Sequence, residues 1–216
     1  PVKSIHELCK SLVDSGVDVT VFTTNANGST VLDVNTSAPV FIDGVKVFYF
    51  PVGWPVLYFY SFQLKKALKE NIWEYGLVHI HWLYVFTTLV ASGECIQKNI
   101  PYLISPRGML DSNAISLKSS FKKKIYLKFI EKKHLASANY IQFSSLGEQL
   151  QAEKSGWQFT SCVVGNGLYL EDYIYSGPTN FLNEIYPETK GKKLVLFLGR
   201  LNYIKGIEFL IKAWGN

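Results

Sequence analysis

Short apolar runs, each followed by a segment with helical spacing, recur along most of this chain of 216 residues. Residues 77–82 and 101–105 are runs of this kind, too short for a helix and rich in β-branched or aromatic side chains. Such a run predicts a buried parallel strand, and the helical pattern after it predicts a crossover helix. The mixed segment 139–145 is predicted as a further strand. The alternation predicts an α/β fold, a Rossmann-like parallel sheet with helices on both faces.

The rest of the chain follows the same alternation. Further strands are predicted at 17–23, 44–50, 160–164 and 194–198, and helices at 4–13, 62–72, 84–96, 118–136, 145–155 and 205–214. A chain that opens with a helix before its first parallel strand lacks the strand that should feed that helix, so we expect one more strand ahead of Pro1.

A change of composition divides the sequence. Gly, Pro, Asn and Thr accumulate between residues 176 and 192, where periodicity weakens, and this favours an interdomain linker. Residues 1–175 are then a first Rossmann-like domain. Residues 193–216 hold the first strand, turn and helix of a second such domain.

Composition excludes several classes of protein. Apolar residues make up 48% of the chain and charged residues 18%, which is enough for a packed core. No apolar run approaches the ~18 residues of a membrane span. Cys9, Cys95 and Cys162 lie far apart without metal-binding spacing, which favours a reduced cytoplasmic compartment and disfavours a structural zinc site.

Positive charge gathers at the turn after the strand predicted at 194–198. Gly199 and Arg200 end that run, and Lys205 opens the helical pattern. The first N–H groups of a helix and its dipole favour an anion at such a turn, so the pattern is typical of a phosphate site. The alternative is an ordinary solvent-exposed loop of a strand–helix unit.

Other polar residues follow the carboxyl ends of predicted strands, where ligands of doubly wound sheets bind. His79 and His81 share one face of their strand, and Arg107 with Gly108 follows the next strand. A metal pair at the histidines is disfavoured, because no third ligand has a supporting spacing. The sequence therefore predicts that His81 lines a ligand cleft and that Arg107 meets an anion or a sugar hydroxyl.

Two more strand ends contribute candidates. Ser145 or Ser144 is predicted to cap the next helix, and Glu148 stands at capping-box spacing from Ser145. Asn166 and Gly167 follow the strand at 160–164. The predicted lining of the cleft is completed by Ser145, Glu148, Asn166 and Gly167.

Two surfaces have alternative interpretations. The aromatic residues from Phe48 to Phe62 can fill the core, or they can stack on sugars or touch a membrane. The predicted helix from Lys118 to Lys133 carries seven lysines, on either a solvated face or one attracted to an anionic bilayer by ~1 kcal/mol per lysine. Nucleic acid is not expected as a partner, because no aromatic residues are interleaved with these lysines.

At this point the sequence resembles the family 4 glycosyltransferases, whose GT-B fold sets two Rossmann-like domains face to face. The resemblance rests on VTVFTTN, VHIHWL, YLISPRGML, FSSLGE, VVGNGLYLEDY and LFLGRLNYIKGIEFLIKAW, in this order along the chain. The element GR-x4-KG, from Gly199 to Gly206, is the most telling of them.

The resemblance implies a retaining transfer of a sugar from a nucleotide-sugar to an acceptor hydroxyl, without a metal or another cofactor. Arg200 and Lys205 match the pair that holds the donor diphosphate. Arg107 stands where many relatives have the histidine of an H-G pair that contacts the donor sugar. Asn166 lies in the element that relatives write V-x-P-N-G, with Gly165 in place of the proline.

The resemblance also implies a polysaccharide or lipid-linked acceptor, a pathway of surface polysaccharide biosynthesis, and a place in the cytoplasm or on the inner face of the cell membrane. The family's glycine-rich loop is expected before Pro1 and its E-x7-E element after Asn216, so these 216 residues alone are expected to be inactive. A Rossmann-like oxidoreductase or epimerase, or a non-catalytic membrane- or polysaccharide-binding module, are the alternatives.

Overall fold

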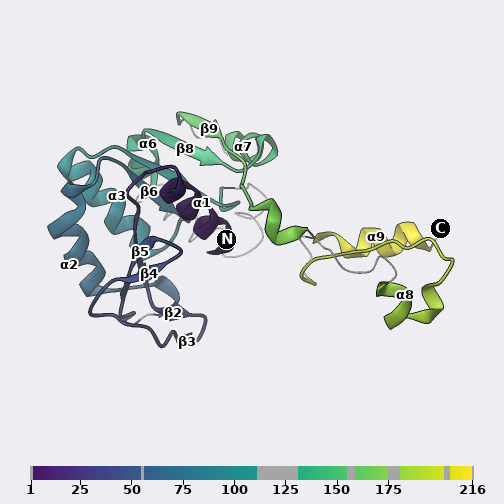
Figure 1. Ribbon diagram of the computed structural model, residues 1–216. Helices are drawn as coiled ribbons and strands as arrows, with labels where there is room; N and C mark the ends of the chain where they lie inside the picture. Colours follow the sequence, from purple (N-terminus) through teal and green to yellow (C-terminus); the bar gives the residue numbers. More distant parts are fainter. Residues whose placement is uncertain are drawn as a thin grey trace. The chain divides into compact units, whose positions relative to one another are not determined.

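The chain forms two compact units in a computed structural model (Figure 1). The units are Pro1–Tyr169 and Leu170–Asn216. The structure describes residues 2–54, 56–110, 131–154, 159–174, 181–201 and 205–215.

The first unit alternates strands and helices as the sequence predicts. Its strands are β1 (Thr20–Thr24), β2 (Ala26–Asn27), β3 (Thr30–Val31), β4 (Val40–Ile42), β5 (Val45–Phe50), β6 (Val78–His81), β7 (Tyr102–Ser105), β8 (Tyr140–Phe143) and β9 (Ser161–Val163). Its helices are α1 (Val2–Asp14), α2 (Phe62–Asn71), α3 (Phe86–Lys98), α6 (Lys132–Ser137) and α7 (Leu146–Glu153), with 3-10 turns at Val56–Tyr58 and Ile72–Glu74.

The central feature of this unit is a four-stranded parallel sheet in the order β6-β7-β8-β9. Ile80 lies beside Ile104, and Ile104 beside Ile141, so buried apolar residues follow one line across the sheet. The parallel arrangement follows from the chain path, because a helix returns the chain to the same edge between consecutive strands. The predicted α/β class with a parallel sheet is confirmed.

A second, smaller sheet has the order β1-β5-β4, with β1 and β5 parallel and β4 antiparallel to β5. A short antiparallel hairpin, β2 with β3, follows β1. Neither β4 nor the hairpin was predicted from the sequence. Strands of two or three residues are too short to show a two-residue period.

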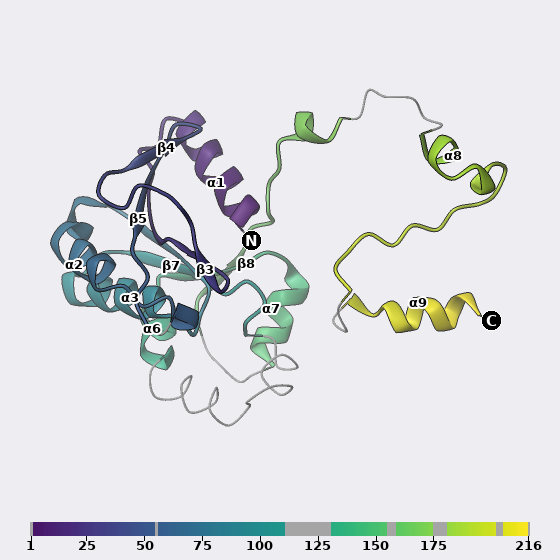
Figure 2. The same cartoon turned by 90° about the horizontal axis from the view of Figure 1, so that it is seen from below.

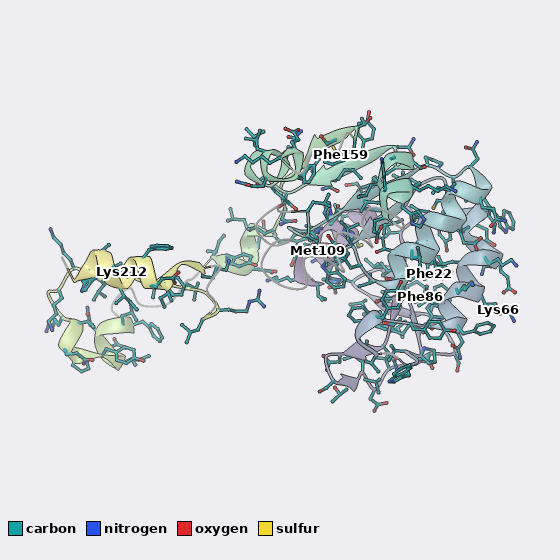
Figure 3. All side chains as sticks on the ribbon, turned by 180° about the vertical axis from the view of Figure 1, so that it is seen from behind. Phe22, Lys66, Phe86, Met109, Phe159 and Lys212 are labelled. Atoms are coloured by element: carbon teal, nitrogen blue, oxygen red, sulfur yellow. The ribbon has the colours of Figure 1, made fainter. Side chains whose placement is uncertain are left out.

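Helices cover both sides of these strands (Figure 2): α1 packs on β5 from one side, and α2, α3 and α6 lie on the other. The main core contains Leu64 and Leu68 of α2, Val90 and Cys95 of α3, and apolar residues of β6, β7 and β8. Figure 3 shows Phe22 and Phe86 inside this unit, whereas Lys66 extends from its surface.

Packing decides between the two interpretations of the aromatic segment only in part. Phe48 and Phe50 stack with Phe22, which is core filling. Trp54 is 88% exposed, and the ring of Phe59 lies against that of Trp82. The aromatic residues therefore divide between the core and the surface.

The second unit corrects one prediction. The run predicted as a buried strand at 194–198 forms no strand, and Leu196 and Leu198 are 79% and 91% exposed. The physical reason is the lack of a ladder partner: no other strand occurs among the described residues of this unit, and a strand needs a neighbour for its backbone N–H and C=O groups. The helix predicted after the turn is present as α9 (Ile207–Trp214).

The segment predicted as a linker, 176–192, contains α8 (Phe181–Ile185) and a 3-10 turn at Pro187–Thr189 within its described part, and a further 3-10 turn at Leu170–Tyr173 precedes it. Its role as a linker stays a prediction. Most of the helix predicted at 118–136 lies outside the described residues. No helix in the described ranges has the length and apolar character to cross a bilayer.

Candidate functional site

Three predicted cleft residues meet at the carboxyl ends of the parallel strands. Arg107, just after β7, donates from Nη1 to Oδ1 of Asn166 at 2.5 Å, and its Nη2 lies 3.4 Å from Nδ1 of His81 at the end of β6. One guanidinium thus connects the ends of β6, β7 and β9. We call His81, Arg107 and Asn166 the arginine triad.

The backbone at Arg107 is unusual. Arg107 has φ 55° and Gly108 has φ 80°, so two consecutive residues adopt the left-handed region. That region is costly for a residue with a Cβ and persists where surrounding contacts hold it. The loop therefore needs an anchor.

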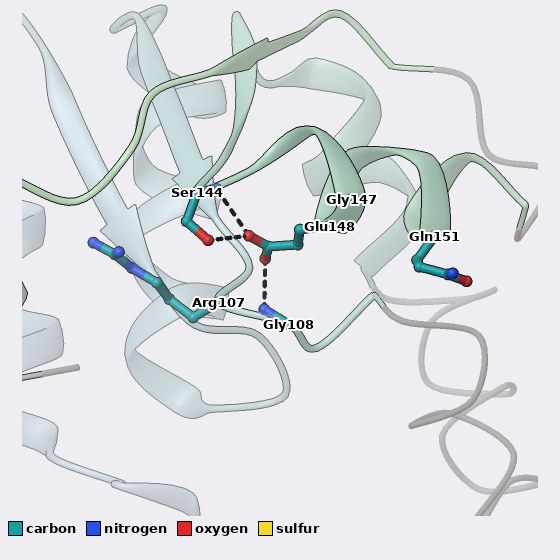
Figure 4. Close-up of a pocket in the computed structure, with 6 residues that line it drawn as sticks. All are labelled: Arg107, Gly108, Ser144, Gly147, Glu148 and Gln151. Atoms are coloured by element: carbon teal, nitrogen blue, oxygen red, sulfur yellow. Dashed lines mark hydrogen bonds between the residues drawn. The ribbon is translucent and has the colours of Figure 1, made fainter. Parts of the chain in front are cut away.

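Glu148 of α7 supplies the anchor (Figure 4). Its carboxylate accepts hydrogen bonds from the backbone N–H of Gly108 at 2.6 Å, from the N–H of Ser144 at 2.8 Å and from the Ser144 hydroxyl at 2.6 Å. Charge-assisted bonds of this kind are stronger than neutral ones. The carboxylate fastens the loop after β7 to the turn after β8, and the negative charge lies where the helix dipole favours it.

The cap predicted for α7 is present. The hydroxyl of Ser145 accepts from the N–H of Glu148 at 3.2 Å. A capping box would direct the Glu148 carboxylate to the N–H of Ser145, but it bonds to the N–H of Ser144. The glutamate fastens two loops instead of closing the box.

Ser145→Ala is expected to lower the free energy of unfolding by about 1 kcal/mol, because it removes the acceptor for one N–H of the first helical turn. Urea unfolding followed by circular dichroism measures the change. Glu153→Ala, an exposed position in the last turn of α7, is the control and should change stability by less than about 0.5 kcal/mol. Equal effects of the two substitutions would contradict the cap.

A pocket of about 410 Å³ opens beside this anchor. It is lined by Arg107, Gly108, Ser144, Gly147, Glu148 and Gln151 (Figure 4). Ser144, Gly147 and Gln151 were not predicted to line a site. Ser144 was predicted only as the alternative cap, and only the fold shows that its N–H and hydroxyl donate to Glu148.

A second polar group runs through the sheet behind the triad. The rings of His79 and His81 lie on the same face of β6, as predicted, with centroids 4.1 Å apart. His79 Nε2 lies 2.7 Å from the hydroxyl of Ser105, which donates to Oε1 of Gln142 at 3.0 Å; Nε2 of Gln142 donates to the carbonyl of Val164. We call His79, Ser105 and Gln142 the polar relay.

Both histidines are neutral at physiological pH. Burial, with a smaller contribution from the Arg107 charge, lowers the pKa of His79 to about 4. Burial, then His79 and then Arg107, lowers the pKa of His81 to about 2. Burial also lowers the pKa of Arg107, which Glu148 opposes, and the guanidinium stays charged.

These pKa values predict a pH dependence of stability. The unfolded chain binds protons at both histidines below about pH 6.5, whereas the folded chain binds them only below about 4 and 2. The free energy of unfolding should therefore fall as the pH decreases from 6.5 towards 4, by at most about 1.4 kcal/mol per pH unit for each proton.

Urea unfolding between pH 4.5 and 8 measures this slope. The double variant His79→Gln, His81→Gln should have a shallower slope in the acid range. An unchanged slope would show that other groups cause the acid sensitivity.

Metal-ligand clusters are not seen in the described ranges: no group of three or more His, Cys, Asp or Glu side chains stands there with the geometry to hold an ion. One ring nitrogen of each histidine already has a protein partner: Nε2 of His79 contacts the Ser105 hydroxyl, and Nδ1 of His81 contacts Arg107. Metal independence stays a prediction.

The predicted phosphate-binding residues belong to the second unit. Gly199, Arg200 and Lys205 are exposed, and Gly206, with φ 62°, is the N-cap of α9. Gly167 is exposed after Asn166 in the first unit. Their assignment to a donor site stays a prediction.

Comparison with known proteins identifies the fold. A family model described as Glycosyltransferase Family 4 matches residues 2–145, well over half of the chain. Sucrose-phosphate synthase from Thermosynechococcus elongatus has a similar structure, with a TM-score of 0.64 and 17% sequence identity. The match covers 97% of this chain and 52% of that enzyme, so this chain spans about half of its length. No curated protein matches the chain by sequence.

Proposed function

The chain belongs to glycosyltransferase family 4, and we propose that the protein transfers a sugar from a nucleotide-sugar donor to a hydroxyl group of a polysaccharide or lipid-linked acceptor, with retained anomeric configuration and without a metal. The observation that supports a sugar site most directly is the arginine triad. It places a charged donor, an imidazole and an amide at the edge of the sheet where α/β proteins bind ligands. Such groups match sugar hydroxyls.

In the proposed reaction the bond between the sugar C1 and the donor diphosphate breaks, and a bond from C1 to the acceptor oxygen forms. Negative charge develops on the leaving diphosphate, where Arg200 and Lys205 would stabilise it. The acceptor proton goes to an oxygen of the released diphosphate. The histidines are poor bases for this proton, because their pKa values near 4 and 2 lie far below neutral pH.

The unfilled donors of Arg107 support a contact with the sugar. Five N–H groups belong to an arginine, and two nitrogens contact His81 and Asn166. In the described part of the chain nothing accepts a hydrogen bond from its enclosed Nε. Nε is enclosed, but Nη1 and Nη2 each carry a second N–H that a sugar hydroxyl or a phosphate oxygen can accept from.

The remaining alternatives differ in what they bind. An oxidoreductase or epimerase of similar fold would require a nicotinamide dinucleotide, and the family match argues against it.

We further propose surface polysaccharide biosynthesis at the cytoplasmic face of the membrane. The lysine-rich segment that motivates this location lies largely outside the described residues, and Lys132 and Lys133 at its end belong to α6.

A panel of nucleotide-sugars tests the function in the complete protein. We expect one of them to raise the melting temperature and to be hydrolysed or transferred, with unchanged rates in the presence of EDTA. The matching nucleoside monophosphate is the control and should stabilise the protein less, because it lacks the second phosphate and the sugar. Stabilisation by NAD or NADP with none from any nucleotide-sugar would overturn the proposal.

A further inference from the structure

We propose that His81 is held as a neutral imidazole with its proton on Nε2, and that this N–H donates a hydrogen bond to an oxygen of the bound sugar. Arg107 imposes this state on His81, and the polar relay fixes the tautomer of the neighbouring His79. The inference rests on the proposed function only for the identity of the ligand. The protonation state itself follows from the contacts of the folded chain.

Gln142 of β8, the strand next to β7, has a fixed amide orientation. Its Nε2 donates to the carbonyl of Val164 at 3.3 Å, and the N–H of Val164 is itself bonded to Phe143. An amide nitrogen can only donate and an amide oxygen can only accept. The contact with Val164 therefore fixes the orientation of the amide, and its oxygen faces Ser105.

The hydroxyl of Ser105 carries a single proton, and Oε1 of Gln142 at 3.0 Å requires it. The lone pairs of the same hydroxyl oxygen then face Nε2 of His79 at 2.7 Å, so Nε2 must carry a proton. The opposite tautomer would bring the Ser105 oxygen and the Gln142 oxygen together without a proton between them. The polar relay thus sets His79 as the Nε2–H tautomer.

The tautomer of His81 is fixed by its contact with Arg107. A guanidinium has only donors, so Nδ1 of His81, 3.4 Å from Nη2 of Arg107, must present a lone pair. The proton of the neutral ring is then on Nε2. Double protonation is opposed by the charge of Arg107 and by the ring of His79, whose centroid lies 4.1 Å away.

As a consequence, Nε2 of His81 can only donate a hydrogen bond to a ligand. Within the described residues, Nε2 of His81 has no hydrogen-bond partner, and the ring is half-buried at the end of β6. A neutral N–H donor on Nε2 selects an acceptor oxygen, such as that of a sugar hydroxyl. It also excludes His81 as a general base at this nitrogen, since the nitrogen has no lone pair to offer.

Nitrogen NMR tests the tautomers without any substrate. The chain has four histidines, so two-bond ¹H–¹⁵N spectra of ¹⁵N-histidine protein can be assigned with single His variants. We expect His79 and His81 to show protonated Nε2 and unprotonated Nδ1 from pH 6 to pH 8. A protonated Nδ1 or a doubly protonated ring at His81 at neutral pH would overturn the inference.

Two variants test the cause. Ser105→Ala should mix the tautomers of His79, and Arg107→Met should mix those of His81. Ser92→Ala is the matched control, because the Ser92 hydroxyl contacts Nδ1 of His134, away from the triad; it should change the His134 signals alone. Unchanged His79 and His81 tautomers in the two test variants would overturn the proposed origin of the state.

Kinetics test the ligand contact. His81→Phe should reduce kcat/KM by roughly tenfold, which is the size of one neutral hydrogen bond. His81→Gln, whose amide can place an N–H near the same position, should recover part of the loss. If the Phe variant is fully active and the NMR tautomers are as expected, the proposed contact between His81 and the sugar is wrong, whereas the proposed function still stands.

Discussion

Alanine at Arg200 or at Lys205 is expected to lower kcat/KM of the complete protein by roughly 10²-fold each, and the double variant should lose more. Both cations are proposed to face the donor diphosphate, where negative charge increases as the sugar departs. An interaction that strengthens with this charge should appear mainly in kcat. Initial rates over a range of donor concentrations separate kcat from KM.

Two controls make this result specific. Lys212→Ala removes a cation from the last turn of α9, the helix that follows Lys205, and should leave the transfer rate unchanged. Arg200→Lys should retain part of the activity, because it keeps the charge without the forked donors. If both alanine variants transfer sugar at the normal rate, the assignment of the diphosphate site is wrong.

The second large effect is expected at Arg107. Arg107→Ala removes the guanidinium that connects His81 to Asn166 and the donors proposed to contact the sugar. We expect a loss of about 10²- to 10³-fold in kcat/KM, the range observed when one oriented donor is removed from an active site. Rates at several donor concentrations measure it.

Stability must be separated from activity in this experiment. Arginine and alanine both carry a Cβ, so Arg107→Ala does not change the steric cost of the left-handed backbone at φ 55°. The variant should therefore keep a melting temperature close to that of the wild-type protein while its kcat/KM falls. Lys66→Ala, an exposed cation paired with Glu70 on α2, is the control for general loss of charge. Normal transfer by the Arg107 variant would contradict the proposed sugar contact.

The positions of His81, Arg107 and Asn166 at the ends of predicted strands indicated that these residues gather at one edge of the sheet. His81 lies near the end of one predicted strand, Arg107 and Asn166 follow two others, and the carboxyl ends of parallel strands share one edge of a sheet. The sequence therefore predicts which residues gather, and the structure adds how they touch. The polar relay was not predicted, because Ser105 and Gln142 lie inside strands, where their spacing resembles that of ordinary core positions.

Glu148 shows the limit of local patterns. Its spacing from Ser145 predicted a capping box, and the cap itself is present. The carboxylate bonds to Gly108, forty residues earlier in the chain, and to Ser144 instead of Ser145. Local spacing fixes the helix start, whereas the choice of partner depends on which loop the fold brings within reach.

The sequence by itself determined the alternation of strands and helices, the α/β class and the loops that carry the site, because these depend on apolar periodicity and on turn residues along one stretch of chain. Tertiary structure alone decided the pairing of Arg107 with Asn166 and the contacts of the two histidines from which we infer their tautomers. It also left the run 194–198 without a strand. Hydrogen bonds between distant residues and strand pairing both need partners that only the folded chain brings together.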